Sequence, residues 1–267
     1  LYVKHMVEIF RGVRRVLRDE GTVWLNLGDS YAQSGGSGKG EYQKRHKQFG
    51  KIIKTGTAQN PRKAPSGLKP KDLVGIPRMV AFALRADGWY LRQDIIWHKP
   101  NPMPESVTDR PTKAHEYVFL LAKAKRYFYD ADAIREPHVH PLHAPGNKTH
   151  NGRLTASMGH FEEPDRVWGN PSGRNKRSVW TIATKPFPEA HFATFPPALI
   201  EPCILAGCPA GGVVLDPFMG SGTTALVAFE HERNYLGIEL NPEYIKLANW
   251  RLERRKRQGL QVHILGR

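Results

Sequence analysis

A glycine-rich turn in the last third of the chain has the residue types and spacing of a ligand site. The apolar run Val213 to Leu215 leads into Asp216 to Thr224, with the sequence DPFMGSGTT, and a helical pattern follows. Gly220 and Gly222 have no side chains, so a nucleotide-like ligand could approach the backbone closely at this turn. A lone Gly-x-Gly is more often a structural turn than a binding site, so its interpretation depends on the residues around it.

A second strand pattern, Leu236 to Glu239, lies about twenty residues downstream and ends in a carboxylate. A carboxylate at that place can accept hydrogen bonds from both hydroxyl groups of a ribose. A turn that binds a pyrophosphate usually carries a third glycine and no acidic residue. Asp216 at the start of the turn therefore favours a ligand with a positive charge.

The segment from Asp216 to Asn241 resembles the cofactor-binding segment of the S-adenosylmethionine-dependent DNA methyltransferases that modify exocyclic amino groups. It is similar in particular to their permuted class, which carries this segment near the C-terminus. The resemblance implies S-adenosyl-L-methionine as the cofactor, with Asp216 facing its methionine end, Glu239 binding its ribose and Phe218 lining the pocket. The cofactor residues that it implies are Asp216, Pro217, Phe218, Gly220, Gly222, Thr223, Glu239, Asn241, His191 and Phe195.

His191 and Phe195 belong to the run HFATFP, which resembles the element that closes over the methionine moiety in this class. A packed loop anchor is an equally good interpretation of these two residues. Earlier segments extend the resemblance. Arg14 to Asp29 resembles the strand that follows the catalytic loop, and Trp89 to Pro104 resembles the strand and loop beside the target base.

These methyltransferases use a catalytic loop of the form (Ser, Asp or Asn)-Pro-Pro-(Tyr, Phe or Trp). The exocyclic amine is a poor nucleophile because its lone pair is delocalised, so a side-chain oxygen and a prolyl carbonyl accept its hydrogens while the aromatic residue stacks on the flipped base. Phe195 to Ala198 has the prolines without the acceptor or the aromatic, and Asn101 to Pro104 interrupts the pair. In the permuted class the loop precedes a helix like Tyr2 to Leu17, so we expect it before Leu1 and assign no catalytic residue.

The charge of the chain predicts a polyanionic partner. Lys and Arg outnumber Asp and Glu by 40 to 25 in 267 residues, a formal net charge of +15. Nucleic acid and an acidic membrane surface both fit this balance, and the resemblance implies double-stranded DNA as the partner. Arg and Asn could read guanine and adenine edges in its major groove, and Lys could neutralise its phosphates. A solvated basic loop is an equally good interpretation of the cations in residues 33–71. The candidate DNA-binding residues are Lys99, Asn101, Arg153, Arg174, Lys176 and Arg177.

Apolar spacing predicts alternating helices and strands outside two irregular regions. The expected helices are Leu1–Leu17, Leu73–Ala86, Pro197–Leu205, Thr223–Glu230 and Pro242–Gln258, and the expected strands are Thr22–Leu27, Tyr90–His98, Glu116–Ala122, Val213–Asp216 and Tyr235–Glu239. This order indicates an α/β protein. The resemblance implies a Rossmann-like class I methyltransferase fold, a mostly parallel sheet with an antiparallel edge hairpin formed by the Tyr90 and Glu116 strands.

We expect one methyltransferase domain in three parts. Residues 1–136 form its catalytic-side half, within which residues 33–71 are a mobile basic loop. Residues 137–177 form the target-recognition segment, which the resemblance places between the two halves. Residues 178–267 form the cofactor-binding half.

The remaining features exclude several classes. Cys203 and Cys208 are the only cysteines, and the histidines are irregularly spaced, so we expect no metal site. No apolar run approaches the roughly 18–20 residues that span a bilayer, so no membrane partner is expected. Neither cysteine resembles the nucleophile of ring-carbon methylation, which favours direct methyl transfer. We expect a cytoplasmic, nucleoid-associated protein of bacterial, archaeal or phage origin.

Together these observations predict a site-specific DNA methyltransferase acting on an exocyclic amino group of a flipped base. The stretch Asp109 to Tyr117 resembles one subgroup and favours N4 of cytosine over N6 of adenine. The main alternative is a catalytically incomplete relative that binds DNA and cofactor without methylating. A nucleotide-binding oxidoreductase and an RNA or protein methyltransferase stay open, and a restriction endonuclease would be a partner if the role is restriction-modification.

Overall fold

The computed structural model describes residues 1–32, 67–138, 170–184 and 195–265. Its helices are α1 (Tyr2–Val16), α2 (Ile76–Ala86), the 3-10 helix η2 (Asp132–Ile134), α3 (Pro197–Gly207), α4 (Thr223–Glu230) and α5 (Pro242–Leu265). Its strands are β1 (Thr22–Leu27), β2 (Tyr90–His98), β3 (His115–Ala122), β4 (Val179–Thr181), β5 (Val213–Asp216) and β6 (Asn234–Gly237). Every helix and strand expected from the sequence is present, although several of their ends are displaced.

Four strands form one sheet in the order β1-β3-β2-β4, and β5 and β6 form a separate parallel pair. β3 runs antiparallel to β1 and to β2, whereas β4 runs parallel to β2. The predicted hairpin of the Tyr90 and Glu116 strands therefore forms, as β2 and β3, but the prediction that it lies at an edge is wrong. β1 and β4 flank it, and a strand as short as β4 is not revealed by a periodic pattern.

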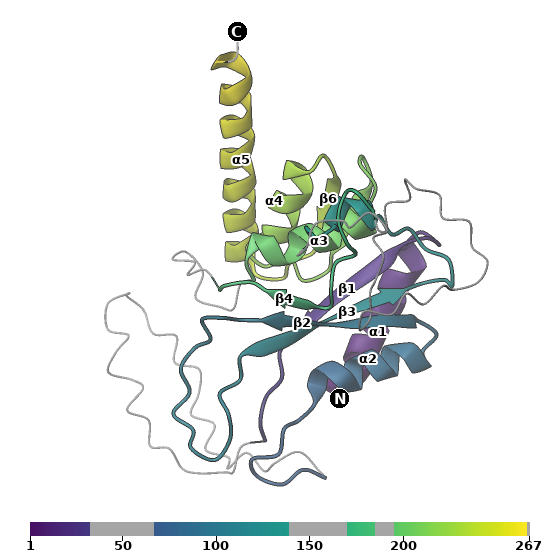
Figure 1. The fold of residues 1–267 in the computed structure, drawn as a ribbon, viewed down its shortest axis with the longest axis vertical. Helices are drawn as coiled ribbons and strands as arrows, with labels where there is room; N and C mark the ends of the chain where they lie inside the picture. Colours follow the sequence, from purple (N-terminus) through teal and green to yellow (C-terminus); the bar gives the residue numbers. More distant parts are fainter. Residues whose placement is uncertain (33–66, 139–169, 185–194, 266–267) are drawn as a thin grey trace, which may run out of the picture.

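The first core lies between this sheet and the helices α1 and α2, which cover one of its faces (Figure 1). Phe10 of α1 meets Trp89 edge to face, with 6.5 Å between the ring centroids. Leu84 of α2 and Leu121 of β3 are fully buried in the same cluster. Truncating a leucine at such a site costs about 2–5 kcal/mol, so this core holds both helices against the sheet.

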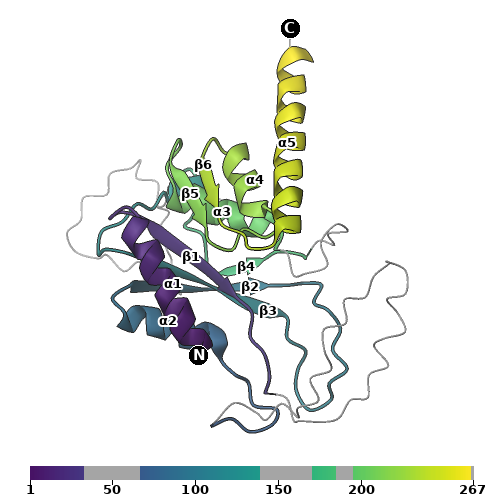
Figure 2. The ribbon, with the colours of Figure 1, turned by 180° about the vertical axis from the view of Figure 1, so that it is seen from behind.

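The opposite face of the sheet is covered by α3, which also joins the two sheets. Leu199 and Cys203 of α3 pack against Trp97 and Trp180, while Ile204 packs in the separate cluster beneath α4 and β5. Figure 2 shows α3 between the four-stranded sheet and the β5–β6 pair, with α5 projecting away from the body. The position of the β5–β6 pair relative to the larger sheet thus depends on α3.

The start of α2 is fixed by a residue that is distant in sequence. Asp29, which follows β1, accepts the backbone N–H groups of Gly75 and Ile76 through Oδ1, at 2.9 and 3.1 Å. These N–H groups would otherwise lack partners at the helix start. For this reason α2 begins at Ile76 rather than at Leu73, where the apolar pattern placed it.

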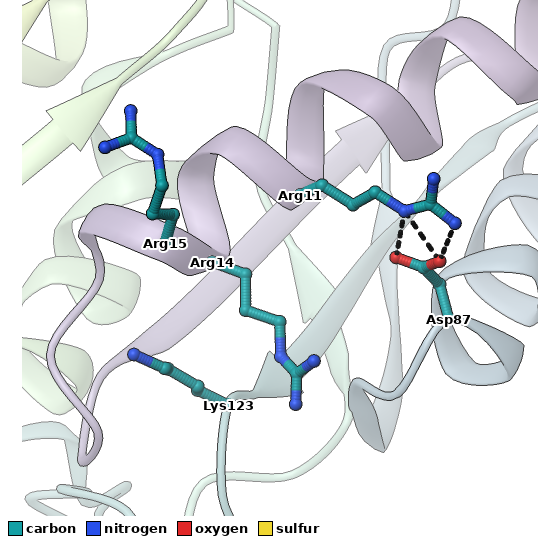
Figure 3. Close-up of a pocket in the computed structure, with 5 residues that line it drawn as sticks. All are labelled: Arg11, Arg14, Arg15, Asp87 and Lys123. Carbon is teal, nitrogen blue, oxygen red and sulfur yellow. Dashed lines mark hydrogen bonds and ion pairs between the residues drawn. The ribbon is translucent and has the colours of Figure 1, made fainter.

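The last turns of α1 lie beside the end of α2 (Figure 3). The Arg11 guanidinium forms an ion pair with Asp87, with Nε at 2.9 Å from Oδ1. Hydrogen bonding from Arg11 lowers the pKa of Asp87. Arg14, Arg15 and Lys123 line the same open pocket, and Lys123 Nζ donates to the carbonyl of Leu17 at 2.7 Å. The cations near the end of α1 complement the negative end of its helix dipole.

Candidate cofactor site and nucleic-acid contacts

The glycine turn joins the end of β5 to the start of α4 through two residues in left-handed conformations. Gly220 has φ of 54° and Gly222 has φ of 82°, values that L side chains adopt only with strain. A Cβ on Gly222 would lie 2.8 Å from the Cβ of Ala248 in α5. A Cβ on Gly220 would meet only the carbonyl oxygen of Phe218, at 3.9 Å. Gly222 is therefore required for packing against α5, whereas the space beside Gly220 is open to a ligand.

Asp216, the last residue of β5, is held in place by the turn that follows it. Its Oδ1 accepts the backbone N–H of Phe218 at 2.9 Å, and its Oδ2 accepts the hydroxyl of Thr224 at 2.6 Å. Thr224 was not among the predicted site residues. A hydroxyl on the second residue of the following helix is the signal that could have identified Thr224, because such a group can reach back to the carboxylate at the strand end.

Glu239 follows β6 and binds the same turn. Its Oε2 accepts the backbone N–H of Gly220 at 2.8 Å, and its Oε1 accepts that of Asn241 at 2.8 Å. Asp216 pairs with Gly237 in the parallel ladder, so the strands bring the two predicted carboxylates to the same end of the β5–β6 pair. Each carboxylate oxygen has two acceptor sites, so ribose hydroxyls could still bind Glu239.

Two other predicted cofactor residues have structural partners. Thr223 is buried, and its hydroxyl accepts from Arg251 of α5 at 3.3 Å. Arg251 also donates to the carbonyl of Ser221 at 2.6 Å, which fastens the turn to α5. Asn241 lies just before α5, and its Oδ1 accepts the N–H of Glu243 at 3.0 Å, in the manner of a helix N-cap.

The remaining predicted cofactor residues lie in different surroundings. Pro217 is partly buried in the turn, while Phe218 beside it is 53% exposed, so its ring is free to cover a ligand. Phe195 is partly buried and packs against the cluster that contains Trp97, Trp180 and Leu199. That contact agrees with a loop anchor. His191 lies outside the described residues.

Lys99, predicted to contact DNA, lies in a charged network at the end of β2. Its ammonium pairs with Glu116 and lies 4.3 Å from the centroid of the Trp97 ring. Glu116 also accepts a hydrogen bond from Asn26 Nδ2 at 3.2 Å. The side chains of Lys99 and Glu116 are only 19% and 24% exposed. The sequence did not identify Glu116 or Asn26, because the network joins three strands far apart in the chain.

Asn101 forms a reciprocal clamp with the segment that follows β4. Its Nδ2 donates to the carbonyl of Thr184 at 3.0 Å, and its Oδ1 accepts the N–H of Thr184 at 2.9 Å. Both polar atoms of the amide are thus used within the protein. Its predicted contact with DNA would require this clamp to share or release those atoms.

Arg174, Lys176 and Arg177 gather around one carboxylate, Glu136. Their nitrogen to oxygen distances are 3.4, 4.0 and 2.9 Å respectively. Burial opposes ionisation of Glu136, but hydrogen bonds and charge from Arg177 outweigh it and hold its pKa below the ordinary value. Backbone bonds between Glu136 and Arg174 join the two ends of the segment that contains Arg153, which itself lies outside the described residues.

The described residues predicted to contact DNA lie at two places along β2. Lys99 and Asn101 follow its last residue, whereas Arg177 lies two residues before the first residue of β4. Since β4 runs parallel to β2 and Val179 pairs with Ile96, Arg177 lies alongside the middle of β2.

The described part of the chain has no group of three or more side chains suited to hold a metal ion. Cys203 and Cys208 are free thiols there, and burial raises the pKa of both. A raised pKa keeps a thiol protonated and makes it a poor nucleophile. Among the same residues, no helix is both long and apolar enough to cross a bilayer.

Two carboxylates at the carboxyl ends of neighbouring parallel strands, both bonded to an open glycine turn, have the arrangement at which Rossmann-like folds bind nucleotide-like ligands. The protein is a Rossmann-like methyltransferase that uses S-adenosylmethionine. Within that class the chain belongs to the DNA methylase family, whose N6/N4 methyltransferase model matches residues 1–250. It is accordingly a DNA amino-methyltransferase, and DNA is its substrate.

Similar proteins support the family. The chain is 47% identical to the Type II methyltransferase M.SmaI of Serratia marcescens over 256 residues, covering 96% of this chain and 75% of that protein. It is 46% identical to the Type II methyltransferase M.Cfr9I of Citrobacter freundii over 252 residues, covering 94% and 71%.

Solved structures support the fold. The PvuII DNA methyltransferase (cytosine-N4-specific) superposes with a TM-score of 0.59 at 18% identity, covering 94% of this chain and 70% of that one. The putative DNA modification methylase TTHA0409 of Thermus thermophilus, in complex with S-adenosyl-L-methionine, superposes with a TM-score of 0.54 at 21% identity, covering 95% and 77%.

Proposed function

We propose that Asp216 and Glu239 hold S-adenosyl-L-methionine across the glycine turn, and that the methyl group passes to the N4 amino group of a flipped cytosine in double-stranded DNA. The observation that carries the residue assignment is that both carboxylates bind this one turn. Asp216 accepts the N–H of Phe218, and Glu239 accepts that of Gly220. A ligand lying over Gly220 would therefore have the Asp216 carboxylate near one end of the ligand and the Glu239 carboxylate near the other.

Each proposed contact has a physical basis. The Asp216 carboxylate attracts the positively charged methionine end, and Glu239 accepts hydrogen bonds from the ribose hydroxyls. Phe218 covers the adenine with its exposed ring. We include Pro217, Gly222 and Thr223 as residues that shape the turn, Asn241 as one that places Glu239, and His191 and Phe195 as parts of a segment over the methionine.

The bound cofactor supplies a methyl group activated by its sulfonium sulfur. The protein's contribution is to align the target amine with that methyl group and to exclude water. The hydrogens of the amine need two acceptors in the transition state, which a (Ser, Asp or Asn)-Pro-Pro-aromatic loop would provide. The 267 residues contain no such four-residue motif. This observation favours a second candidate function, a chain that binds cofactor and DNA without methylating by itself.

Further assignments extend the proposal. The choice of cytosine rests on the resemblance of Asp109 to Tyr117 to one methyltransferase subgroup. Residues 137–177 are proposed to recognise the target sequence, and Lys99, Asn101, Arg153, Arg174, Lys176 and Arg177 to contact DNA. We also propose a cytoplasmic, nucleoid-associated location and a cognate restriction endonuclease as a partner.

Analysis of digested nucleosides tests this function. The protein, together with any residues that precede Leu1 in the native polypeptide, is incubated with methyl-labelled S-adenosyl-L-methionine and double-stranded DNA. The DNA is then hydrolysed and examined by mass spectrometry. Labelled N4-methylcytosine is the expected product, and Glu239→Ala should abolish it. N6-methyladenine would overturn the cytosine assignment. Unmodified DNA with intact binding of S-adenosylhomocysteine would establish the second candidate.

A further inference from the structure

A second pocket lies away from the cofactor turn, on the α3 side of the four-stranded sheet. Its volume is about 380 Å³, and its lining includes Trp24, Tyr127, Tyr129, Arg92, Lys176 and Arg177. Arg92 is near the first residue of β2, and Arg177 lies two residues before the first residue of β4. The pocket therefore lies over residues 92–95 of β2 and the start of β4, whereas Lys99 and Asn101 follow the carboxyl end of β2.

One wall of the pocket is aromatic and firmly supported. Trp24 stacks on Tyr129 with 6.3 Å between centroids and 20° between planes. The ring centroid of Trp24 also lies 6.2 Å from that of Trp180, whose indole N–H donates to the carbonyl of Arg177 at 2.7 Å. Tyr129 is still 42% exposed, so the outer part of this wall can accept another flat ring. Burial raises the pKa of Tyr129, which keeps its hydroxyl protonated as a hydrogen-bond donor.

The rim of the pocket is cationic, and none of the described residues that line it carries a carboxylate. Glu136, behind the rim, is shared by Arg174, Lys176 and Arg177. Arg92 donates to the hydroxyl of Tyr127 at 3.1 Å, and no ion pair of Arg92 is found in the described part of the chain. Three cations, Arg92, Lys176 and Arg177, therefore line the pocket, and two of them share the carboxylate of Glu136. The excess positive charge favours an anionic ligand at the mouth.

An aromatic wall beneath a cationic rim suits a ligand with a flat ring and a phosphate. Base stacking on aromatic side chains and phosphate contacts to Arg are the two elements of single-strand nucleic-acid sites. We propose that this pocket binds one unstacked nucleotide of a DNA strand, with its base against Tyr129 and Trp24 and its phosphate between Arg92 and Arg177. The inference rests on the proposed function only for the source of the nucleotide.

Such a contact would differ from the capture of the target base, because the pocket is not at the strand ends that hold the cofactor carboxylates. It would engage a nucleotide outside the target base pair. Arg177 of the pocket pairs with Glu136, and Glu136 forms a backbone bridge with Arg174, so the same strand could also contact Arg174.

Fluorescence anisotropy with a labelled oligothymidylate tests the pocket. Saturating S-adenosylhomocysteine is present so that the cofactor turn is filled. Thymidine 5′-monophosphate should compete with the labelled strand, and thymidine or inorganic phosphate should compete far less, because each provides only one of the two contacts. Equal competition by inorganic phosphate would overturn the stacking half of the inference. Mononucleotide binding as tight as that of the strand would instead identify a free nucleotide as the source.

Variants separate the pocket from general charge attraction. Tyr129→Ala and Arg92→Gln should each weaken oligothymidylate binding by on the order of tenfold. Arg126→Gln removes the same charge from an exposed residue that does not line the pocket, and should change binding less than about twofold. Equal losses for Arg92→Gln and Arg126→Gln would overturn the inference.

Arg92 is exposed, so its replacement keeps the test valid even if Tyr129→Ala fails to fold. Binding of S-adenosylhomocysteine is measured on each variant by calorimetry and should be unchanged. Loss of that binding in the unaltered chain, with the oligothymidylate pattern intact, would count against the proposed function and leave the pocket standing.

Discussion

Glu239 Oε2 accepts the backbone N–H of Gly220 at 2.8 Å, which joins the end of one parallel strand to the turn that follows its neighbour. The bond joins the residue after the end of β6 to the turn that follows β5, and the Ile238 N–H donates to the carbonyl of Asp216 at 2.9 Å nearby. A charged acceptor for a backbone amide strengthens such a bond relative to a neutral one. The turn and the second carboxylate consequently form one preformed unit.

Alanine at the two glycines should separate ligand binding from folding. Gly220→Ala places an L residue at φ of 54° in otherwise open space, so it should lower the free energy of unfolding by only about 1 kcal/mol while weakening cofactor binding. Gly222→Ala adds a contact of 2.8 Å with the Ala248 Cβ, so it should cost about 2–4 kcal/mol. Urea denaturation measures both. Adding Ala248→Gly should restore part of the second loss, and a larger loss for Gly220→Ala would contradict this division.

Thr224→Val tests the orientation of Asp216. The variant removes the hydroxyl that donates to Asp216 Oδ2 at 2.6 Å, so S-adenosylhomocysteine should bind severalfold more weakly, and stability should fall by about 1 kcal/mol. Calorimetric titration gives the affinity. Thr223→Val is the matched control, because that hydroxyl contacts Arg251 instead. A greater loss of affinity for Thr223→Val would count against the positioning role of Thr224.

The ion pair of Lys99 with Glu116 at the end of β2 should give unequal effects in a double-mutant cycle. Glu116→Gln leaves the partly buried Lys99 without its carboxylate and should destabilise the chain by about 2 kcal/mol. Adding Lys99→Met should recover part of that loss. If Lys99 also contacts a phosphate, Lys99→Met should weaken binding to double-stranded DNA and reduce its salt slope by about 1. Unchanged DNA binding would restrict Lys99 to a structural role.

The ion pair of exposed Arg11 with the partly buried Asp87 should make a small contribution to stability that depends on pH (Figure 3). The folded-state pKa of Asp87 is lowered by hydrogen bonding from Arg11. The contribution is therefore present above the unfolded pKa of about 3.9 and is lost as the pH falls through the lower folded value. Urea midpoints of Asp87→Asn should lie slightly below those of the unaltered chain at pH 7, with a gap that closes toward pH 3. A difference in urea midpoint that widens as the pH falls would contradict a lowered pKa for Asp87.

The cofactor segment was predictable because its information is local. A strand, a turn with two glycines and a helix follow one another from Val213 to Glu230, and each step has its own pattern in the sequence. The same local patterns located the strands around Tyr90 and Glu116. They did not reveal β4, which has three residues, or the resulting central position of the hairpin.

The contacts that modify the predicted site are long-range. Asp29 caps α2 from 46 residues away, Asn101 binds Thr184 across 83 residues, and Arg177 reaches Glu136 across 41. No periodic pattern encodes such pairs, because they depend on which chain segments the sheet brings together. For the same reason Asn101 and Arg177 could be predicted as polar contacts to DNA but not as partners of particular side chains.

Calorimetric titration of the chain with S-adenosylhomocysteine, with Glu239→Gln as the variant, tests the central assignment most directly. The unaltered chain should bind one equivalent, and Glu239→Gln should bind at least about tenfold more weakly, because the variant weakens bonds to both the turn and the ribose. Glu243→Gln, at the exposed start of α5, should bind like the unaltered chain. Equal affinity for the unaltered chain and Glu239→Gln, or no binding by either, would contradict the assignment of this turn as the cofactor site.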